Sequence, residues 1–167
     1  LKNNHATPEQ KVALIRCYNY YQAEPPVSVE PLAKFLAELP AGPTKEVTQG
    51  QLNAMRLAAL DVLAAAGKVE SKQLKATLLD MLKAEDPKIR QAVLQTIADA
   101  RLTGATPALI EQFESTRDES SRRELIRTLG MIGESSAYRS IRPGMLSKDP
   151  LTRIETLRAF AGINAGM

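Results

Sequence analysis

The residues that most often perform catalysis are scarce in this sequence, which contains one histidine and one cysteine. His5 stands in a polar segment, and Cys17 follows Leu14 by three residues in an apolar pattern typical of a helix, which predicts a buried, unreactive thiol. Nucleophilic catalysis needs a base beside the nucleophile, and zinc sites gather several Cys and His ligands. We therefore predict no catalytic, metal-binding or cofactor-binding residue, and we expect that the chain is not an enzyme.

Two other groups of side chains have a spacing that could serve binding. Glu111 and Glu114 lie one helical turn apart, and residues 18–21 read Tyr-Asn-Tyr-Tyr. Paired acids are common on solvated helix surfaces, so the glutamates alone do not indicate acid–base chemistry. The aromatic cluster either closes the end of a hydrophobic core or forms a docking surface.

The composition favours a folded helical domain that binds no highly charged polymer. Hydrophobic residues make up 44% of the 167 residues and aromatic residues 4%, so the core must consist of small and aliphatic side chains. The formal net charge is +3 and both signs are spread along the chain, which disfavours nucleic acid as a partner. The sequence predicts no membrane span, and it leaves the compartment open between the cytoplasm and export.

Helix-start signals recur along the chain. Thr7 with Gln10 and Thr48 with Gln51 have capping-box spacing. An N-cap residue followed by proline occurs at 86–87, 106–107 and 149–150. With the apolar periodicity, these signals predict helices over residues 8–23, 28–39, 48–66, 70–84, 87–101, 106–116, 119–133, 136–147 and 150–163. Residues 40–47 are the expected irregular joint, and Pro143 with Gly144 should kink or split the helix over 136–147.

Self-comparison shows a repeat of about 32 residues. Residues 86–94 align with 118–126 and 149–157, and residues 56–60 are a degenerate fourth copy. The shared pattern, Asp-Pro-x-x-Arg followed by Ala or Val and Leu, resembles the first helix of HEAT-like repeats such as the bacterial HEAT and PBS-lyase HEAT-like repeats. The resemblance implies an all-α fold, a right-handed α-α superhelix of antiparallel helix pairs.

The same resemblance predicts a single helical-repeat domain over residues 1–167. Residues 1–47 form a divergent N-terminal helix pair and joint, and residues 48–167 form the HEAT-like repeats, of which the last is incomplete. Because the sequence starts at Leu1 and its last predicted helix lacks a second helix, we expect a fragment of a larger protein. That last helix should expose an apolar face, which leaves self-association open.

The repeated arginines suggest a structural ladder. Each arginine follows an aspartate by four residues, so it could pair with its own capping aspartate or with that of the adjacent repeat. An anion-binding stripe is the alternative interpretation. The residues of this predicted ladder are Asp86, Arg90, Asp118, Arg122, Asp149 and Arg153.

Helical repeats usually hold another macromolecule on the surface of their second helices. We therefore predict a non-catalytic protein-interaction or scaffold module with an unidentified protein partner. The candidate partner-binding residues carry charges of both signs, which suits a protein: Lys72, Lys75, Glu111, Glu114, Arg139 and Arg142.

Three alternatives come from known HEAT-like proteins. Some are DNA glycosylases, which bind nucleic acid in a basic groove, and others are bilin lyases. Residues 6–16 are also similar to segments of exported bacterial proteins that join a dehydrogenase-like propeller, HEAT-like repeats and a c-type cytochrome. In that case the chain would be a helical spacer between redox domains.

Overall fold

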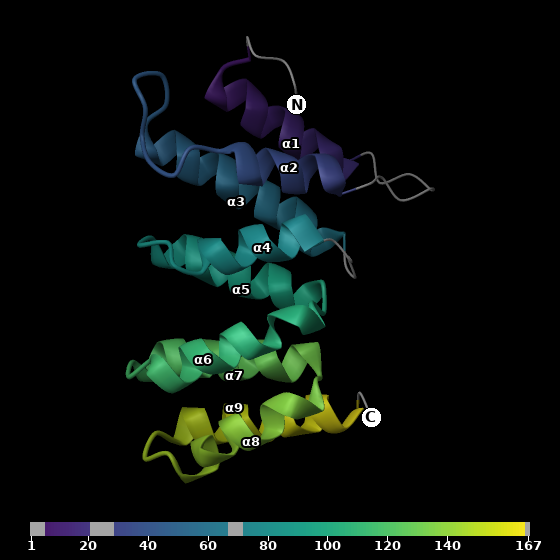
Figure 1. Cartoon of the computed structure of the whole chain (residues 1–167), viewed down its shortest axis with the longest axis vertical. Helices are drawn as coiled ribbons and strands as arrows, with labels where there is room; N and C mark the ends of the chain where they lie inside the picture. The colour runs from purple at the N-terminus through teal and green to yellow at the C-terminus, as the bar shows by residue number, and fades with distance from the viewer. Residues whose placement is uncertain (1–5, 21–28, 67–71, 166–167) are drawn as a thin grey trace. The chain divides into compact units, whose positions relative to one another are not determined.

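The regular structure of the described residues is helical throughout. The computed structural model describes residues 6–20, 29–66 and 72–165, and this part of the chain contains no strand. Its α-helices correspond to the nine predicted from the sequence (Figure 1). They are α1 (Pro8–Tyr20), α2 (Glu30–Glu38), α3 (Gln49–Ala65), α4 (Lys72–Met81), α5 (Pro87–Asp99), α6 (Thr106–Ser115), α7 (Glu119–Ile132), α8 (Tyr138–Ile141) and α9 (Pro150–Ala165).

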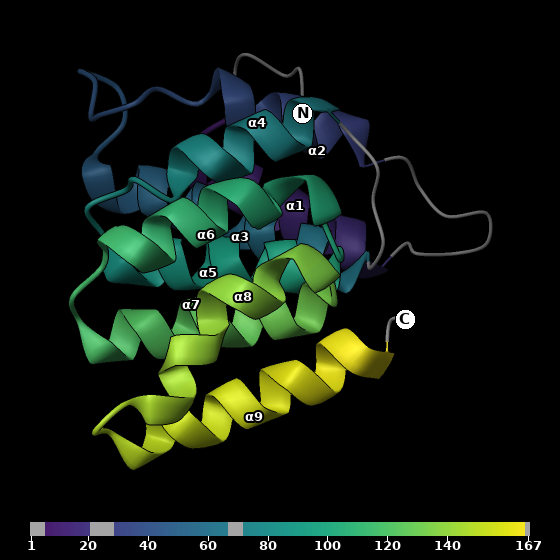
Figure 2. The same cartoon turned by 60° about the horizontal axis from the view of Figure 1, so that its bottom comes forward.

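The chain divides into two compact units, residues 1–96 and 97–167. In the first unit, α1 packs on α3 and α2 packs on α4. In the second unit, α7 packs on α9, and α6 contacts both α7 and α8 (Figure 2). In both units a first helix therefore packs on another first helix, α1 on α3 and α7 on α9, as in stacked helix pairs. The all-α repeat fold is confirmed, whereas the single domain over 1–167 stays a prediction.

Aliphatic side chains fill the cores of both units. Leu52, Leu60 and Leu74 are fully buried in the first, as are Leu109 and Leu125 in the second. The prediction for Cys17 is wrong, because its side chain is exposed on α1. His5 and Tyr21 lie outside the described residues, as do the side chains of residues 18–20.

Both predicted capping boxes are present. Thr48 N donates to Gln51 Oε1 over 2.9 Å, and Gln51 N donates to the Thr48 hydroxyl over 3.3 Å. The same two bonds join Thr7 and Gln10. These reciprocal bonds satisfy backbone donors that the first turn of a helix leaves free.

The predicted N-cap at Thr106 is wrong. A 3-10 turn, η1 (Thr103–Ala105), runs into α6, so Thr106 is already helical and Ala105 occupies the cap position. The amide of Thr106 donates to the carbonyl of Thr103, and that of Ala105 donates to the carbonyl of Leu102. Because the turn supplies these acceptors, the helix start needs no side-chain oxygen.

The backbones of α7 and α9 approach each other closely. A Cβ atom added to Gly130 would lie 2.5 Å from Ala159 Cα, and one added to Gly162 would collide with the carbonyl oxygen of Gly130. Small residues let two helices approach until their backbones touch. Gly130, Ala159 and Gly162 therefore set the spacing of this helix pair.

The ends of two first helices adopt the left-handed conformation. Gly133 ends α7 with φ 80°, as the glycine at this position predicts. Arg101 stands 32 residues earlier, at the equivalent position after α5, and has φ 45°. A side chain with a Cβ atom adopts this conformation only at a cost in free energy, so the repeat is strained at Arg101.

The second helix of the repeat that starts at Asp118 splits as predicted. α8 ends at Ile141 and continues as a 3-10 helix, η3 (Arg142–Leu146), which contains Pro143. Gly144 lies buried against α9, where a Cβ atom would collide with the Thr156 hydroxyl. The lack of a side chain at Gly144 therefore lets η3 pack directly on α9.

Candidate partner-binding surface

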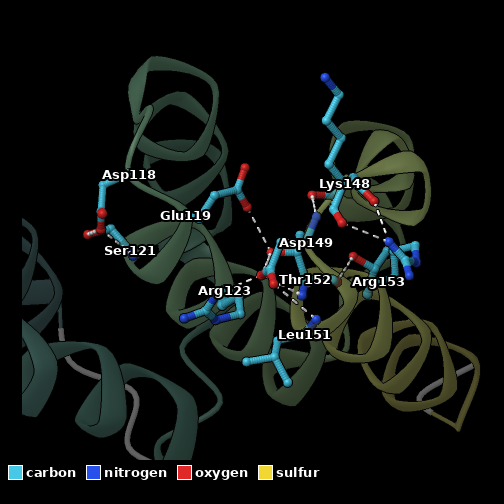
Figure 3. Close-up of polar contacts among 11 residues, drawn as sticks. Asp118, Glu119, Ser121, Arg123, Lys148, Asp149, Leu151, Thr152 and Arg153 are labelled. Atoms are coloured by element: carbon cyan, nitrogen blue, oxygen red, sulfur yellow. Dashed lines mark hydrogen bonds and ion pairs between the residues drawn. The ribbon is translucent and has the colours of Figure 1, made fainter.

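The repeated arginines bind main-chain carbonyls, so their predicted pairing with the aspartates is wrong. Each guanidinium donates two hydrogen bonds to carbonyl groups at the end of the preceding second helix or just beyond it. Arg90 Nη1 donates to the carbonyls of Ala84 and Glu85 (2.7 Å each), Arg122 Nη1 to those of Phe113 and Thr116 (3.2 and 3.0 Å), and Arg153 Nη1 to those of Ser147 and Lys148 (2.8 and 3.1 Å; Figure 3).

The geometry of a helix explains this outcome. Side chains on a helix tilt towards its N-terminus, so each arginine reaches back to the segment that precedes its own helix. The last carbonyls of a helix have no intrahelical donor, and a guanidinium supplies several donors at once. The aspartates are engaged elsewhere: Asp118, for example, accepts 2.8 Å bonds from Ser121 N and Oγ.

The degenerate copy keeps the same contact. Arg56 Nη2 donates to the carbonyls of Pro40 (2.7 Å) and Ala41 (3.2 Å), at the start of the irregular joint that follows α2. Arg122 adds a second interaction, because its guanidinium carbon lies 4.2 Å from the centroid of the Phe113 ring. Four arginines thus join the start of a first helix to the chain that precedes it, which supports a structural role for the series.

A ladder between neighbouring first helices does exist, but in it the predicted aspartates pair with residues other than the repeated arginines (Figure 3). Arg123 Nη1 lies 2.6 Å from Asp149 Oδ2, so α7 and the start of α9 are joined by an ion pair. Thr152 donates to the same oxygen and also lies 2.8 Å from Glu119 Oε2. The hydrogen bond from Thr152, followed by that from Arg123, lowers the pKa of Asp149 to about 2.

Arg123 was missed because the repeat alignment drew attention to its neighbour, Arg122. The available signal was the doubled arginine at 122–123, where the other clear copies have one. In the first unit, Asn53 takes the comparable part: its Nδ2 donates to Asp86 Oδ2 over 2.7 Å. Such links vary in residue type, so a repeat pattern cannot reveal them.

A second charged group joins α7 and α9 at their middle. Glu155 is 7% exposed and accepts from Arg127 Nε (2.7 Å) and Arg158 Nη1 (3.3 Å). Burial alone would raise the pKa of Glu155, but the hydrogen bond and charge of Arg127, with help from Arg158, keep it below the usual value. A carboxylate held ionised in this way is unsuited to donate a proton near neutral pH.

These residues line a groove of about 610 Å³ in the second unit, together with Arg101 and Gly130. Its lining carries three guanidinium groups and two carboxylates, Asp99 and Glu155. Among the described residues, no group of three or more His, Cys, Asp or Glu could hold a metal ion.

The predicted partner-binding residues lie on second helices, as expected. Lys72 and the half-buried Lys75 lie on α4 in the first unit. In the second unit, the exposed residues Glu111 and Glu114 lie on α6, Arg139 on α8 and Arg142 at the start of η3. Because α6 contacts α8, acidic and basic side chains lie on neighbouring helices.

The charged side chains of α6 and α8 differ from those of α7 and α9 in whether they form ion pairs. Within the described part of the chain, Glu111, Glu114, Arg139 and Arg142 form no ion pair, whereas Asp149 and Glu155 are both bound by arginines of the stack. Asp149 and Glu155 are therefore bound within the stack. Glu111 and Glu114 stay at the surface of α6, where a partner can meet them.

The fold is that of a helical-repeat protein. No family model matches the chain, and no curated protein does. The chain is similar to the structure of the complex of CpcE and CpcF of phycocyanin lyase from Nostoc sp. PCC7120, with a TM-score of 0.63 and 19% sequence identity over 99% of this chain and 68% of that chain. Such a low identity shows the fold alone, so the predicted HEAT-like family is supported only through its architecture.

The comparison corrects one prediction. We expected that the chain is not an enzyme, because its sequence lacks a recognisable catalytic set. That expectation is contradicted, since the similar structure belongs to a lyase, which is an enzyme. A chain without a catalytic set of its own can still take part in catalysis as one subunit of a complex.

None of the described helices is long and apolar enough to cross a membrane.

Proposed function

We propose that the chain is a protein-binding helical-repeat module that holds its partner on the face formed by α6 and α8. The observation that carries the proposal is the contrast in charge use. The carboxylates of α9 are bound by arginines of the stack, whereas Glu111, Glu114, Arg139 and Arg142 have no ion-pair partner among the described residues.

A surface with both signs of charge selects a partner of matching pattern. Such a partner would present basic groups to Glu111 and Glu114 and acidic groups to Arg139 and Arg142. Tyr138 adds a large aromatic surface: it is 40% exposed and its ring stacks on Phe160 at a centroid distance of 4.4 Å. Tyrosines of this kind are frequent anchors at protein interfaces.

Two further points support a protein partner. A nucleic-acid backbone placed on the same face would meet the two glutamates, and this repulsion disfavours the nucleic-acid alternative. The similar structure is itself a complex of two proteins, CpcE and CpcF.

The test compares partner retention between variants. Tagged wild-type chain and the variant Glu111→Lys/Glu114→Lys are incubated with lysate of the source cells, and retained protein and nucleic acid are quantified. Glu46→Lys/Asp61→Lys, at exposed positions of the first unit, changes the net charge by the same amount and is the control. We expect a defined protein on the wild type and the control, and its loss on the Glu111→Lys/Glu114→Lys variant. Equal retention on all three, or recovery of nucleic acid that salt removes, would refute the proposal.

A second candidate function follows from the fold comparison: the chain could serve as one subunit of a chromophore lyase, with the partner as the other subunit. To test it, the chain, its captured partner and an acceptor protein are incubated with a bilin. Colour that stays on the acceptor after denaturing electrophoresis, and only when the chain is present, would support this function. An uncoloured acceptor would count against it.

A further inference from the structure

The outer face of α9 carries an exposed apolar stripe. Leu151, Ile154 and Leu157 follow one another at three-residue spacing on one side of the helix, and are 56%, 45% and 54% exposed. The opposite side, with Thr152 and Ala159, is buried. Large apolar side chains scattered singly on a surface are common, but a row of three along one helix marks a face that another element can cover.

The repeat register shows what this face is built to contact. Each position of α9 lies 31 residues after its equivalent in α7, as Arg153 follows Arg122. Several α7 residues contact α9 or are buried beside it. Their equivalents, 31 residues later, lie on the exposed face of α9. These pairs are Arg123 with Ile154, Ile126 with Leu157, Arg127 with Arg158 and Gly130 with Ala161.

In α7, the residues at three of these positions contact α9 or its N-cap residue. Arg123 binds Asp149, Arg127 binds Glu155, and Gly130 lies against Ala159. α9 repeats the last two features, with Arg158 in place of Arg127 and the small Ala161 in place of Gly130. In place of Arg123 it has Ile154, which makes its face more apolar.

The charges around the stripe are cationic. Asp149 and Glu155, the carboxylates of this segment, are already bound by arginines. Lys148, Arg153 and Arg158 are exposed beside the stripe. Two copies of the chain joined through α9 would bring these cations together, which opposes self-association.

From these observations we infer that the exposed face of α9 binds an acidic amphipathic helix of a protein partner. The bound helix carries apolar side chains against Leu151, Ile154 and Leu157, a carboxylate for Arg158 and a small residue against Ala161. It occupies on α9 the place that α9 occupies on α7. This surface is separate from the α6 and α8 face of the proposed function, so each can fail without the other.

The probe is a synthetic peptide with the sequence of residues 148–165 that carries Lys148→Glu and Arg153→Glu. This segment has the face that α7 accepts, and the two substitutions make it acidic. It is titrated up to millimolar concentration into the isotope-labelled full chain and followed by NMR. We expect shifts along the exposed face of α9, which disappear in the Leu157→Asp chain and persist in the Leu14→Asp control, since Leu14 is 50% exposed on α1. Peptide with Glu155→Gln should bind about tenfold more weakly, because it offers Arg158 no charge.

The peptide variant keeps the test valid if Leu157→Asp unfolds the chain, because it leaves the protein unchanged. Absence of shifts, shifts confined to α7 or equal affinity for the Glu155→Gln peptide would overturn the inference. Light scattering of the chain alone is the complementary measurement. A dimer that Leu157→Asp converts to monomer would also overturn it, in favour of a second copy as the occupant.

Discussion

Replacing Gly130 by alanine tests the close approach of α7 and α9. The new Cβ atom would lie 2.5 Å from Ala159 Cα and 2.6 Å from Ala159 Cβ, and both of these atoms are fixed by the backbone. An ordinary contact between such atoms begins at 3.4 Å, so the helices must separate by about 0.9 Å at this point. The bonds between Arg127 and Glu155, and between Arg123 and Asp149, span the same interface and must stretch or reorganise.

The expected loss of stability is the difference between two effects. Overpacking of a tightly packed interface costs about 1–3 kcal/mol, and alanine gains up to about 1 kcal/mol over glycine inside a helix. We expect a net destabilisation of about 1–2 kcal/mol. For a chain of this length, that lowers the melting temperature by roughly 2–8 °C.

Thermal unfolding followed by circular dichroism measures the effect. Gly50→Ala is the matched control, because Gly50 lies in the first turn of α3 and a Cβ atom there would have nothing within 4 Å. It should leave the melting temperature unchanged or raise it. Gly162→Ala should act like Gly130→Ala, since its Cβ atom would collide with the Gly130 carbonyl. A Gly130→Ala protein as stable as the Gly50→Ala protein would refute the packing argument.

Three other predictions concern stability. Arg122→Ala should lower the free energy of unfolding, measured with urea, by about 1–3 kcal/mol, because two carbonyls lose a charged donor. Arg117→Ala, at an exposed position, should lower it little. Equal losses would contradict the structural role of Arg122. The pKa of Asp149 is lowered from 3.8 to about 2, so its contribution to stability is complete above pH 3.8 and is lost as pH falls towards 2. Asp149→Asn should therefore flatten the fall in melting temperature over this range, and an unchanged slope would count against the ion pair. Arg101→Gly should stabilise the chain by about 0.5 kcal/mol, because glycine adopts positive φ without steric cost; a loss of stability would show that Arg101 makes a contact worth more than its strain.

The sequence predicts the helices well because their signals are local. The capping boxes at Thr7 and Thr48 and the interruption at Pro143 depend on residues a few positions apart, and the structure contains all three. Thr106 fails because its role depends on the 3-10 turn before it. That turn is a backbone choice that a cap pattern does not specify.

The contacts between repeats are harder to predict because they depend on side-chain direction and on the register of two helices. Arg153 and Asp149 have the spacing of a helical ion pair, yet Arg153 bends back to the preceding carbonyls and Asp149 pairs with Arg123. The apolar stripe of α9 can be predicted from the three-residue spacing of Leu151, Ile154 and Leu157. The match between this stripe and the face of α7 that binds α9 can be seen only from the contacts of Arg127 with Glu155 and of Gly130 with Ala159.

The central claim is that a protein partner binds the face formed by α6 and α8. Carbodiimide labelling of carboxylates, read by mass spectrometry with and without the captured partner, tests it most directly. We predict that labelling of Glu111 and Glu114 falls on binding, while labelling of Asp61, exposed on α3, stays constant. Unchanged labelling of both glutamates in a complex that has formed would contradict the claim.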